Sequence, residues 1–573
     1  MNAWREHHDR LLNVEFDWDR DGLETVEPVA GPWPYIEVEK VSKAINKMKL
    51  GKAAGVSELT AEMLKASGDI GAGLVTELVN AIIAEDAIPG DWQRSIIVNV
   101  YKGKGDALDR GNYRGIKLLD QVMKVMERVL EEMIRDRINI DDMQFGFMPG
   151  KGTTDAIFVV RQLQEKYIAG KRKLYFVFVD LEKAFDRVPR EVVRWAMRKL
   201  GIEEWMVRVV MKMYENARTQ VRVNRELSAE FSVNVGVHQG SVLSPLLFIM
   251  VLEALFQAFR TGLPFEVLYT DDLVLIAEDE EAVQEKFKMW REGMDAKGLR
   301  VNINKTKVMI SEVGGGIVRE VGAYPCAVCR TGVGSSSIQC NGCNLWVHKK
   351  CSGIRGRLRN DGDFECAVCM GENVVRERQE RVVLAGESFE CVQEFCYLGD
   401  VICSGGGAEA SSVARIRSGW KKFRELLPLL TMRGFSLRQK GRLYAACVRS
   451  VMLYGSETWA VKEEDTRRLE RTEMRMARWM CGASLSDRRR GERISNEECR
   501  DRLGIESISG VMRRGRLRWF GHVERMDGSN WVRRVKDLKP GGAAARGRPK
   551  KTWDEVIKND LRVMGLKRET AKD

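Results

Sequence analysis

The chain has 573 residues, of which 44% are apolar and 31% are charged, so a globular, core-forming protein is expected rather than a disordered or fibrous one. At roughly 150 residues per domain, this length predicts about three or four domains. The formal net charge is +12, and the segment from Cys481 to Asp573 carries 24 basic and 14 acidic residues. This distribution excludes a uniformly basic coat and favours a local polyanion contact at the C-terminal end.

The sequence contains neither a predicted membrane span nor a secretory signal. The most apolar run, Leu246 to Leu252, has seven residues, whereas a transmembrane helix needs about 20. The first residues, MNAWREHHDR, lack the apolar centre of a signal peptide. Of the 13 cysteines, seven lie between positions 326 and 369. We therefore expect no membrane partner and a reducing compartment, in which clustered cysteines bind metal more often than they form disulfides.

The predicted elements mix helices and strands without a regular alternation, as in an α+β protein. Residues 1–35 are polar and carry Pro28, Pro32 and Pro34, which would interrupt any long helix. Apolar residues at helical spacing predict helices at 41–48, 59–65, 74–84 and 120–138, and mostly helical structure over 412–480. Runs of β-branched and aromatic residues predict strands at 95–101, 174–179, 265–269, 273–277 and 395–402.

Three carboxylates follow or join these strands. Asp180 comes directly after the strand 174–179, and Asp271 and Asp272 lie at the tip of the following strand pair. Carboxylates that converge at a sheet edge raise one another's proton affinity unless cations compensate. Two Mg²⁺ ions about 3.5–4 Å apart are the usual compensation in phosphoryl-transfer enzymes. The Asp-Asp pair alone would equally fit a solvated turn.

The companions of these carboxylates indicate a family. The segments DLEKAFD (180–186), GVHQGSVLSP (236–245), YTDD (269–272) and GLRVNINKTK (298–307) follow one another in the order of the palm motifs A to D of reverse transcriptases. NYRGI (112–116), QFGFMPGKGTT (144–154) and FCYLG (395–399) are similar to a fingers motif, a template-contacting segment and the primer grip. From about residue 40 to 480, the chain resembles the reverse transcriptase of non-LTR (LINE-type) retrotransposons.

The resemblance implies a role for each matching residue. Asp180, Asp271 and Asp272 would hold two catalytic Mg²⁺ ions. The residues that would contact dNTP or template are Phe185 (the gate against a ribose 2′-hydroxyl), Arg114 with Lys102 or Lys104 (the triphosphate), and Gln239 and Gly240 (the nucleotide pocket). Lys305 would assist the departure of pyrophosphate, or is an ordinary surface lysine.

Three positions depart from the family pattern. Thr270 stands where relatives usually carry Ala, and Thr suits a strand. Met148 replaces a usual Arg, which removes one expected template-phosphate contact. Gly115 replaces a usual Pro, which is expected to loosen a fingers turn while Arg114 is kept. None of these changes removes a metal ligand, so we expect a competent enzyme.

The cysteine-rich insert has metal-ligand spacing. It reads Cys-x2-Cys-x10-Cys-x2-Cys-x4-His-x2-Cys-x14-Cys-x2-Cys, enough for two tetrahedral Zn²⁺ sites whose binding is coupled to folding. The order resembles a PHD finger, with a RING finger as the alternative. The PHD resemblance implies one zinc on Cys326, Cys329, His348 and Cys351, and another on Cys340, Cys343, Cys366 and Cys369. Trp346 with Tyr324 would form part of a methyl-lysine cage, or Trp346 is the small core of the finger.

Two basic segments near the C-terminus have patterns of nucleic-acid contact. Arg513 to His522 interleaves guanidinium groups with Trp519 and Phe520, which suits phosphate contact and base stacking. Arg546 to Lys551 (RGRPKK) resembles an AT-hook core. Each segment equally fits a solvated basic face. Similar segments end related retrotransposon proteins, which favours nucleic-acid binding.

The sequence thus predicts a right-hand polymerase of fingers, palm and thumb with a small zinc-binding insert and a mainly helical, basic C-terminal region. Its expected domains are an N-terminal extension (1–40), fingers (41–170), palm motifs A–D (171–312), a PHD-like insert (313–385), primer grip and helical thumb (386–480) and a basic nucleic-acid-binding region (481–573). Before the fingers, too few residues remain for an endonuclease.

The expected function is RNA-directed DNA polymerase activity, with an RNA template, a DNA primer or target DNA, dNTPs and, through the finger, a histone tail as partners in the nucleus. The alternatives are a domesticated or decayed copy that only binds nucleic acid or chromatin, and a ubiquitin ligase built on a RING finger. The intact carboxylates argue against the first, and the ligand order argues against the second.

Overall fold

The structure is a computed structural model, which describes residues 1–103, 105–257, 259, 266–312, 324–328, 332–333, 336–341, 345–354, 364–367, 369–370, 381–482, 494–541 and 550–571. The chain divides into two compact units. Unit 1 consists of Met1–Ala156, Phe178–Leu275 and Gln284–Thr306, and unit 2 consists of Ile157–Val177, Ile276–Val283 and Lys307–Asp573.

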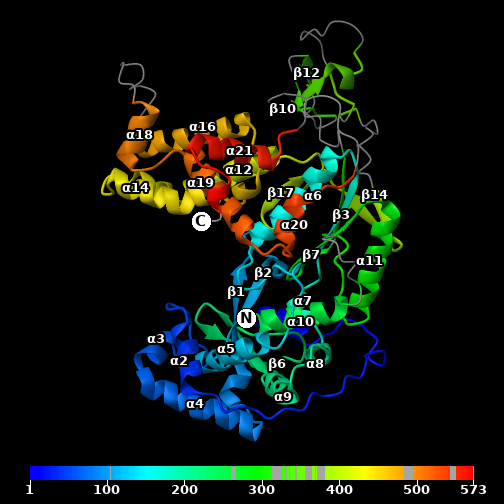
Figure 1. Cartoon of the computed structure of the whole chain (residues 1–573), viewed down its shortest axis with the longest axis vertical. Coiled ribbons are helices and arrows are strands. Elements are labelled where there is room, and N and C mark those ends of the chain that lie inside the picture. The colour runs from blue at the N-terminus through cyan, green and yellow to red at the C-terminus, as the bar shows by residue number, and fades with distance from the viewer. Residues whose placement is uncertain are drawn as a thin grey trace. The chain divides into compact units, whose positions relative to one another are not determined.

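The chain up to residue 311 contains both helices and strands (Figure 1). Its helices are α1 (Asn2–Leu12), α2 (Val38–Asn46), α3 (Ala61–Ala66), α4 (Gly68–Glu85), α5 (Gln121–Arg135), α6 (Thr153–Ala169), α7 (Ala184–Arg187), α8 (Arg190–Lys199), α9 (Glu204–Lys212), α10 (Ser244–Phe256) and α11 (Glu280–Asp295). Its strands are β1 (Arg94–Tyr101), β2 (Tyr113–Leu118), β3 (Leu174–Val179), β4 (Arg218–Val223), β5 (Glu226–Leu227), β6 (Phe231–Ser232), β7 (Glu266–Tyr269), β8 (Asp272–Ala277) and β9 (Lys307–Ser311).

A sheet of order β2-β1-β4-β5, with β6 paired to β4, carries the NYRGI segment on its strand β2. In register, Arg114 faces Val100 of the antiparallel β1. Helix α1 packs on this sheet through Leu11 and Leu12, which are buried with Ile97 and Val221. The proline-based expectation of no long helix in this region missed α1, because the prolines begin only after α1 has ended.

The second sheet has the order β14-β15-β9-β3-β8-β7 and places the palm motifs. All six residues of β3 are buried, which explains the unbroken apolar run 174–179. Strands β7 and β8 form the predicted hairpin, in which Tyr269 faces Asp272. Helix α10 is buried along its whole length, so its long apolar run belongs to a protein core. Among the described residues, no helix is both long and apolar enough to cross a bilayer.

The remaining elements belong to unit 2. The strands are β10 (Tyr324–Pro325), β11 (Gly332–Val333), β12 (Ser337–Gln339), β13 (Trp346–His348), β14 (Arg381–Leu384), β15 (Glu387–Cys391), β16 (Glu394–Tyr397) and β17 (Asp400–Cys403). The helices are α12 (Glu409–Glu425), α13 (Leu427–Thr431), α14 (Leu437–Tyr444), α15 (Ser450–Leu453), α16 (Glu463–Met480), α18 (Asn496–Leu503), α19 (Ile508–Arg525), α20 (Trp531–Asp537) and α21 (Trp553–Met564).

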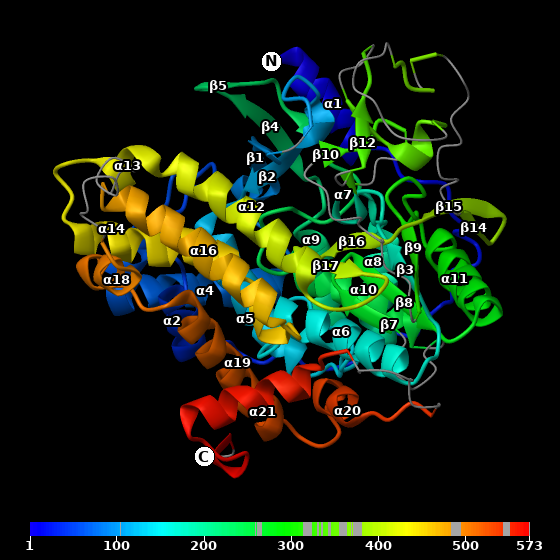
Figure 2. The ribbon, with the colours of Figure 1, turned by 90° about the horizontal axis from the view of Figure 1, so that it is seen from above.

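The helices of unit 2 enclose one core that contains Phe423, Tyr444 and Trp459. Helices α12 and α16 run side by side across this core (Figure 2). The hairpin β16–β17, which holds the FCYLG segment, is fixed by a buried ion pair: Asp400 accepts hydrogen bonds from the Arg161 guanidinium at 2.8 and 2.9 Å. The predicted strand at 395–402 is therefore two strands joined by a tight turn.

Candidate active site

The three predicted carboxylates gather at the ends of neighbouring strands in unit 1. Asp180 follows β3, Asp272 begins β8, and Asp271 lies in the turn before it, while β3 and β8 are adjacent in the sheet. Their ligand atoms are not among the described sets of three that lie within 4.8 Å of one another. The three groups nevertheless lie in electrostatic range, because the charge of Asp180 acts on both of the others.

The surrounding protein raises the pKa values of Asp271 and Asp272, as expected for a site that takes cations. Loss of water raises the pKa of Asp272 to about 6, and the charges on Asp271 and Asp180 add to this rise. Loss of water, and then the charge of Asp180, also raise the pKa of Asp271, whereas the positive charges of Arg114 and Lys305 oppose the rise. Asp271 and Asp272 both keep an exposed face. Three acidic oxygen ligands of this kind fit Mg²⁺, which prefers carboxylates and water.

The GLRVNINKTK segment runs beside the end of β3 and fixes Asp180. The Asp180 carbonyl accepts a hydrogen bond from the Asn302 backbone N–H at 2.8 Å, and the Asp180 N–H donates to the Thr306 hydroxyl at 3.2 Å. The Lys305 Nζ donates to Asp180 Oδ2 at 3.0 Å. Lys305 is thus a neighbour of the carboxylates, although its side chain is 65% exposed, and both of its predicted interpretations stay open.

The two cations predicted to meet the triphosphate lie in different settings. Arg114 is exposed on β2, and its charge reaches Asp271. Lys102 follows β1, and its Nζ donates to the Gly111 carbonyl at 2.8 Å, so this ammonium is engaged within its own loop. Lys104 lies outside the described residues. Arg114 is therefore the predicted triphosphate contact that the structure brings toward the carboxylates.

Phe185, Gln239 and Gly240 come together in unit 1, although they belong to motifs that lie far apart in the sequence. The Phe185 ring, half-buried on α7, stacks on Phe248 of α10 with centroids 4.7 Å apart. The Gln239 amide donates to Asp186, the residue after Phe185, at 2.8 Å. Gly240 has a φ of +122°, and a Cβ there would lie 2.4 Å from the Lys117 carbonyl oxygen, so only glycine fits.

The structure corrects two of the three expectations about the departures from the family pattern. Gly115 lies within strand β2, paired with Asn99, and not in a turn. A Cβ at Gly115 would lie 2.6 Å from Cε1 of His8, so the glycine makes room for helix α1. Thr270 lies in the β7–β8 turn rather than in a strand, is 4% exposed and has a φ of +62°, which is strained for a β-branched residue.

The template-contacting segment reaches the same turn. The Phe145 N–H donates to the Leu268 carbonyl at 2.8 Å, and Gly146 lies so close that a Cβ would meet Thr270 Oγ1 at 2.4 Å. Next to Met148, the Arg135 guanidinium lies 3.9 Å from the sulfur. A positive charge therefore remains near this position although the usual Arg is absent.

The insert brings its potential ligands together in two groups. Cys326, His348 and Cys351 form one, and Cys340, Cys366 and Cys369 form the other, with the ligand atoms of each group within 4.8 Å of one another. These are three members of each predicted quartet, and Cys329 and Cys343 lie outside the described residues. Soft thiolates with one imidazole fit Zn²⁺. Trp346 is half-buried against the core of the finger, as the core interpretation expects, and the Tyr324 side chain lies outside the described residues.

The basic C-terminal segments are more deeply anchored than the sequence pattern indicated. Phe520 is buried, and the buried Arg516 pairs with Asp560 at 2.7 Å, so neither of them is available to a nucleic acid. Trp553 is buried against Phe158, with ring centroids 4.8 Å apart. In the AT-hook-like segment, residues 546–549 lie outside the described residues, and Lys550 donates to the Gly405 carbonyl.

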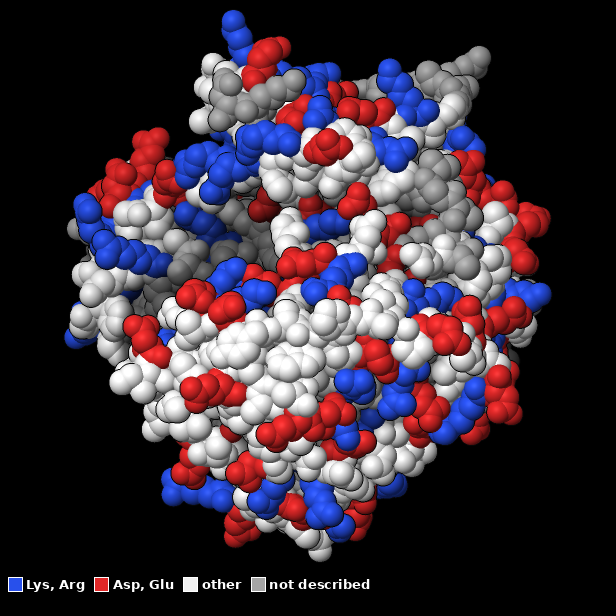
Figure 3. Space-filling model, turned by 60° about the horizontal axis from the view of Figure 1, so that its bottom comes forward, with Lys and Arg blue, Asp and Glu red and all other residues white. Residues whose placement is uncertain are grey.

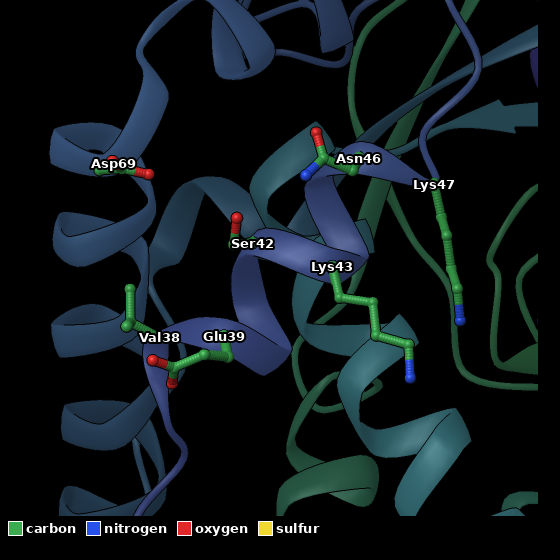
Figure 4. A pocket seen from close by; sticks show the side chains of 7 residues that line it. All are labelled: Val38, Glu39, Ser42, Lys43, Asn46, Lys47 and Asp69. Carbon is green, nitrogen blue, oxygen red and sulfur yellow. The ribbon is translucent and has the colours of Figure 1, made fainter.

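Two further features concern the surface of the described residues: the distribution of charge and one hollow. On the face drawn in Figure 3, basic and acidic side chains are interspersed. A hollow of about 730 Å³ lies between α2 and the start of α4 (Figure 4). It is lined by Val38, Glu39, Ser42, Lys43, Asn46, Lys47 and Asp69, and contains none of the predicted site residues.

Comparison with known proteins agrees with the site. Residues 102–348 match the family described as "Reverse transcriptase (RNA-dependent DNA polymerase)". These residues form a reverse transcriptase domain. The domain contains the three carboxylates, Phe185, Gln239 and Lys305, and the mixed α/β architecture around them is that of a reverse-transcriptase-like polymerase.

The relatives are proteins of non-LTR retrotransposons. The chain is 29% identical over 280 residues to a probable RNA-directed DNA polymerase from transposon BS of Drosophila melanogaster, covering 47% of this chain and 31% of that protein. It is 26% identical to the RNA-directed DNA polymerase from mobile element jockey of Drosophila funebris, covering 50% of this chain and 33% of that protein. The Pol polyprotein of element R2 of Nasonia vitripennis is 25% identical, and the match covers 40% of this chain and 23% of that protein.

The matched segments thus span a quarter to a third of these relatives. Among solved structures, apo telomerase from Candida tropicalis, truncated from its C-terminal domain, is 12% identical with a TM-score of 0.30 over 44% of this chain and 56% of that one. A similarity at this level does not bear on the fold.

Proposed function

We propose that the chain is an RNA-directed DNA polymerase of a non-LTR retrotransposon, which transfers nucleotides from dNTPs to a primer 3′-hydroxyl on an RNA template. One observation carries this proposal: Asp180, Asp271 and Asp272 lie at adjacent strand ends within a reverse transcriptase domain, with Lys305 beside Asp180. Relatives named as RNA-directed DNA polymerases support it. Nuclear location, where target DNA is found, is part of the same proposal.

Each group at the site has a role in this reaction. Two Mg²⁺ ions held by the carboxylates would lower the pKa of the attacking 3′-hydroxyl and stabilise the leaving pyrophosphate. Arg114 neutralises phosphate charge from the β2 side. Lys305, now paired with Asp180, is placed to donate a proton or a positive charge to the departing pyrophosphate. Phe185 closes the sugar side, and its stacking on Phe248 fixes the ring that would meet a 2′-hydroxyl.

We further propose that the insert is a PHD-like zinc finger with two structural Zn²⁺ ions. The interleaved grouping of the described ligands supports it: Cys326 of the first pair lies with His348 and Cys351, and Cys340 of the second pair lies with Cys366 and Cys369. Buried Cys326, Cys340 and Cys366 are contiguous with the apolar core of the finger, so metal binding and folding would be coupled. The proposal includes a histone tail as the ligand of the finger.

A function confined to nucleic-acid or chromatin binding is the second candidate, and the finger and the C-terminal region favour it. Primer extension separates the two. The wild-type chain is incubated with Mg²⁺, dNTPs and a DNA primer annealed to RNA, beside the variants Asp271→Asn and Asp91→Asn. Asp91 is an exposed residue of unit 1 outside the site, so its variant is a matched control for charge loss.

The proposal expects extension by the wild type and by Asp91→Asn, and none by Asp271→Asn, because a carboxamide is a poor Mg²⁺ ligand. Equal extension by all three proteins would indicate a contaminating polymerase and contradict the proposal. No extension by any of them across RNA and DNA templates would favour the binding protein.

A further inference from the structure

The loop that carries Gln239 is held in place from two sides by carboxylates that are not metal ligands. On one side, the Ser241 hydroxyl and the Val242 N–H donate to Glu127 of α5 at 2.6 and 2.8 Å, and Glu127 is 2% exposed. On the other side, the Gln239 Nε2 donates to Oδ1 of Asp186 at 2.8 Å. Two acceptors therefore fix both ends of the turn at 239–242.

Backbone contacts leave this loop little freedom to move. The Lys117 N–H donates to the Gln239 carbonyl at 2.7 Å, and the Val237 N–H donates to the Phe185 carbonyl at 2.8 Å. Gly236 has a φ of +76°, and a Cβ there would lie 2.4 Å from the Asp186 carbonyl oxygen. These contacts fix the backbone of the loop. The orientation of the Gln239 side chain is set separately, by its own hydrogen bond.

Lys117 is a buried residue whose charge acts on Asp186. Its side chain is 3% exposed, and among the described residues its Nζ has no hydrogen-bond partner. Burial raises the pKa of Asp186 to about 6, and the positive charges of Lys117 and Lys183 oppose this rise. Burial also lowers the pKa of Lys117 to about 7, so its ammonium form favours the ionised form of Asp186 chiefly below that pH. Asp186 is therefore ionised at neutral pH and above.

An ionised carboxylate only accepts hydrogen bonds, so the Gln239 amide can approach Asp186 only with its nitrogen. The amide oxygen must then face the other way. We propose that Asp186 is a positioning residue for the polymerase reaction: it turns the Gln239 amide oxygen toward the incoming nucleotide as an acceptor for a hydrogen-bond donor such as a sugar hydroxyl, and Lys117 supports its charge. This inference rests on the proposed function, which places Gln239 in the nucleotide pocket.

The test is steady-state single-nucleotide incorporation by the full chain with Mg²⁺ and a primed RNA template, comparing wild type, Asp186→Asn, Gln239→Glu, the double variant and Asp91→Asn. In Asp186→Asn, the new carboxamide would both donate and accept, so the Gln239 amide loses its fixed orientation. We expect the KM for dNTP to rise about tenfold, as for one hydrogen bond lost, with kcat and melting temperature nearly unchanged.

The double variant decides between positioning and bulk structure. Gln239→Glu alone sets two carboxylates against each other, whereas in the Asp186→Asn background the new carboxamide donates to the carboxylate introduced at position 239, and an acceptor again faces the nucleotide. The inference expects Gln239→Glu to raise KM less in that background than in the wild type. Equal effects in both backgrounds, an unchanged KM for Asp186→Asn, or a parallel loss of kcat and melting temperature would overturn it.

The failure of the proposed function would look different. A wild-type chain that incorporates no nucleotide overturns polymerase activity and the role of Asp186 with it. An active wild type with an insensitive Asp186→Asn variant overturns the positioning role alone. Amide hydrogen exchange over 236–242, faster in Asp186→Asn than in Asp91→Asn, would support the clamp independently of turnover.

Discussion

The ammonium group of Lys305 lies 3.0 Å from Oδ2 of Asp180, across 125 residues of sequence. The pair joins the segment after α11 to the end of β3. The Asn302 N–H, which donates to the Asp180 carbonyl, and the Thr306 hydroxyl, which accepts from the Asp180 N–H, hold it there. Lys305 is therefore positioned by the same strand end that positions a predicted metal ligand. Its charge lowers the pKa values of Asp271 and Asp272, and under the proposed function it would assist the departure of pyrophosphate.

Replacing Lys305 should separate its effect on the leaving pyrophosphate from its effect on Mg²⁺ binding at Asp180. In Lys305→Ala, we expect kcat for extension to fall by about a hundredfold, since a proton or charge donor to the leaving group is lost. The Mg²⁺ concentration for half-maximal rate should fall or stay constant, because a competing cation leaves Asp180. Lys307→Ala is the matched control, since Lys307 pairs with Glu390 instead. A normal kcat in Lys305→Ala would show that Lys305 is only a surface lysine.

Phe185 should control the choice of sugar. In Phe185→Val, the smaller side chain leaves room beside Phe248, and we expect incorporation of NTP relative to dNTP to rise roughly tenfold or more. The measurement is the ratio of kcat/KM values for one NTP and the matching dNTP. Tyr35→Val, at an exposed aromatic outside the site, should keep the wild-type ratio. An unchanged ratio of kcat/KM values in Phe185→Val would exclude a role of Phe185 in selecting the sugar.

Gly115 and His8 should be coupled in stability. Gly115→Ala places a methyl group 2.6 Å from the His8 ring, so we expect a loss of about 1–3 kcal/mol in the free energy of unfolding. His8→Ala should recover part of this loss in the double variant. Gly73→Ala meets nothing within 4 Å on helix α4 and should be neutral or slightly stabilising. If the effects of Gly115→Ala and His8→Ala on the free energy of unfolding are additive, helix α1 does not pack against Gly115 through His8.

The finger should contain two zinc ions per chain, one for each ligand group. Elemental analysis of Cys340→Ser should give one, and Cys396→Ser, at an exposed thiol outside both groups, should keep two. A zinc-selective chelator, added with Mg²⁺ in excess, should unfold the insert while dNTP incorporation by the palm persists. An insert that folds normally without zinc would contradict its assignment as a zinc finger.

Local patterns predicted much of the site. The apolar run 174–179 and the Asp-Asp turn determined where the carboxylates would lie, since strand ends and hairpin turns are set by neighbours in sequence. In the insert, ligand spacing predicted two metal sites, and the resemblance to a PHD finger implied the grouping that the described ligands have. The bond of Gln239 to Asp186, in contrast, joins residues 53 apart and depends on tertiary packing.

Tertiary packing also explains the expectations that were wrong. Gly115 was assigned to a turn because only the missing proline was considered, whereas His8, from the start of the chain, occupies the space beside it. Phe520 was interpreted as a stacking platform from its basic neighbours, although helix α19 turns it into the core and turns other arginines outward. The position of α1 shows the same limit, because its anchors Leu11 and Leu12 are buried by β1 and β4.

The most direct test of the account is single-turnover incorporation of one complementary dNTP into a primer on an RNA template, with Mg²⁺, by wild type and Asp272→Asn. The affinity of each protein for the primed template is measured in parallel. The account predicts incorporation by the wild type and a loss of at least about a thousandfold in Asp272→Asn with unchanged template affinity. Equal rates in the two proteins, or a loss explained entirely by weaker template binding, would contradict it.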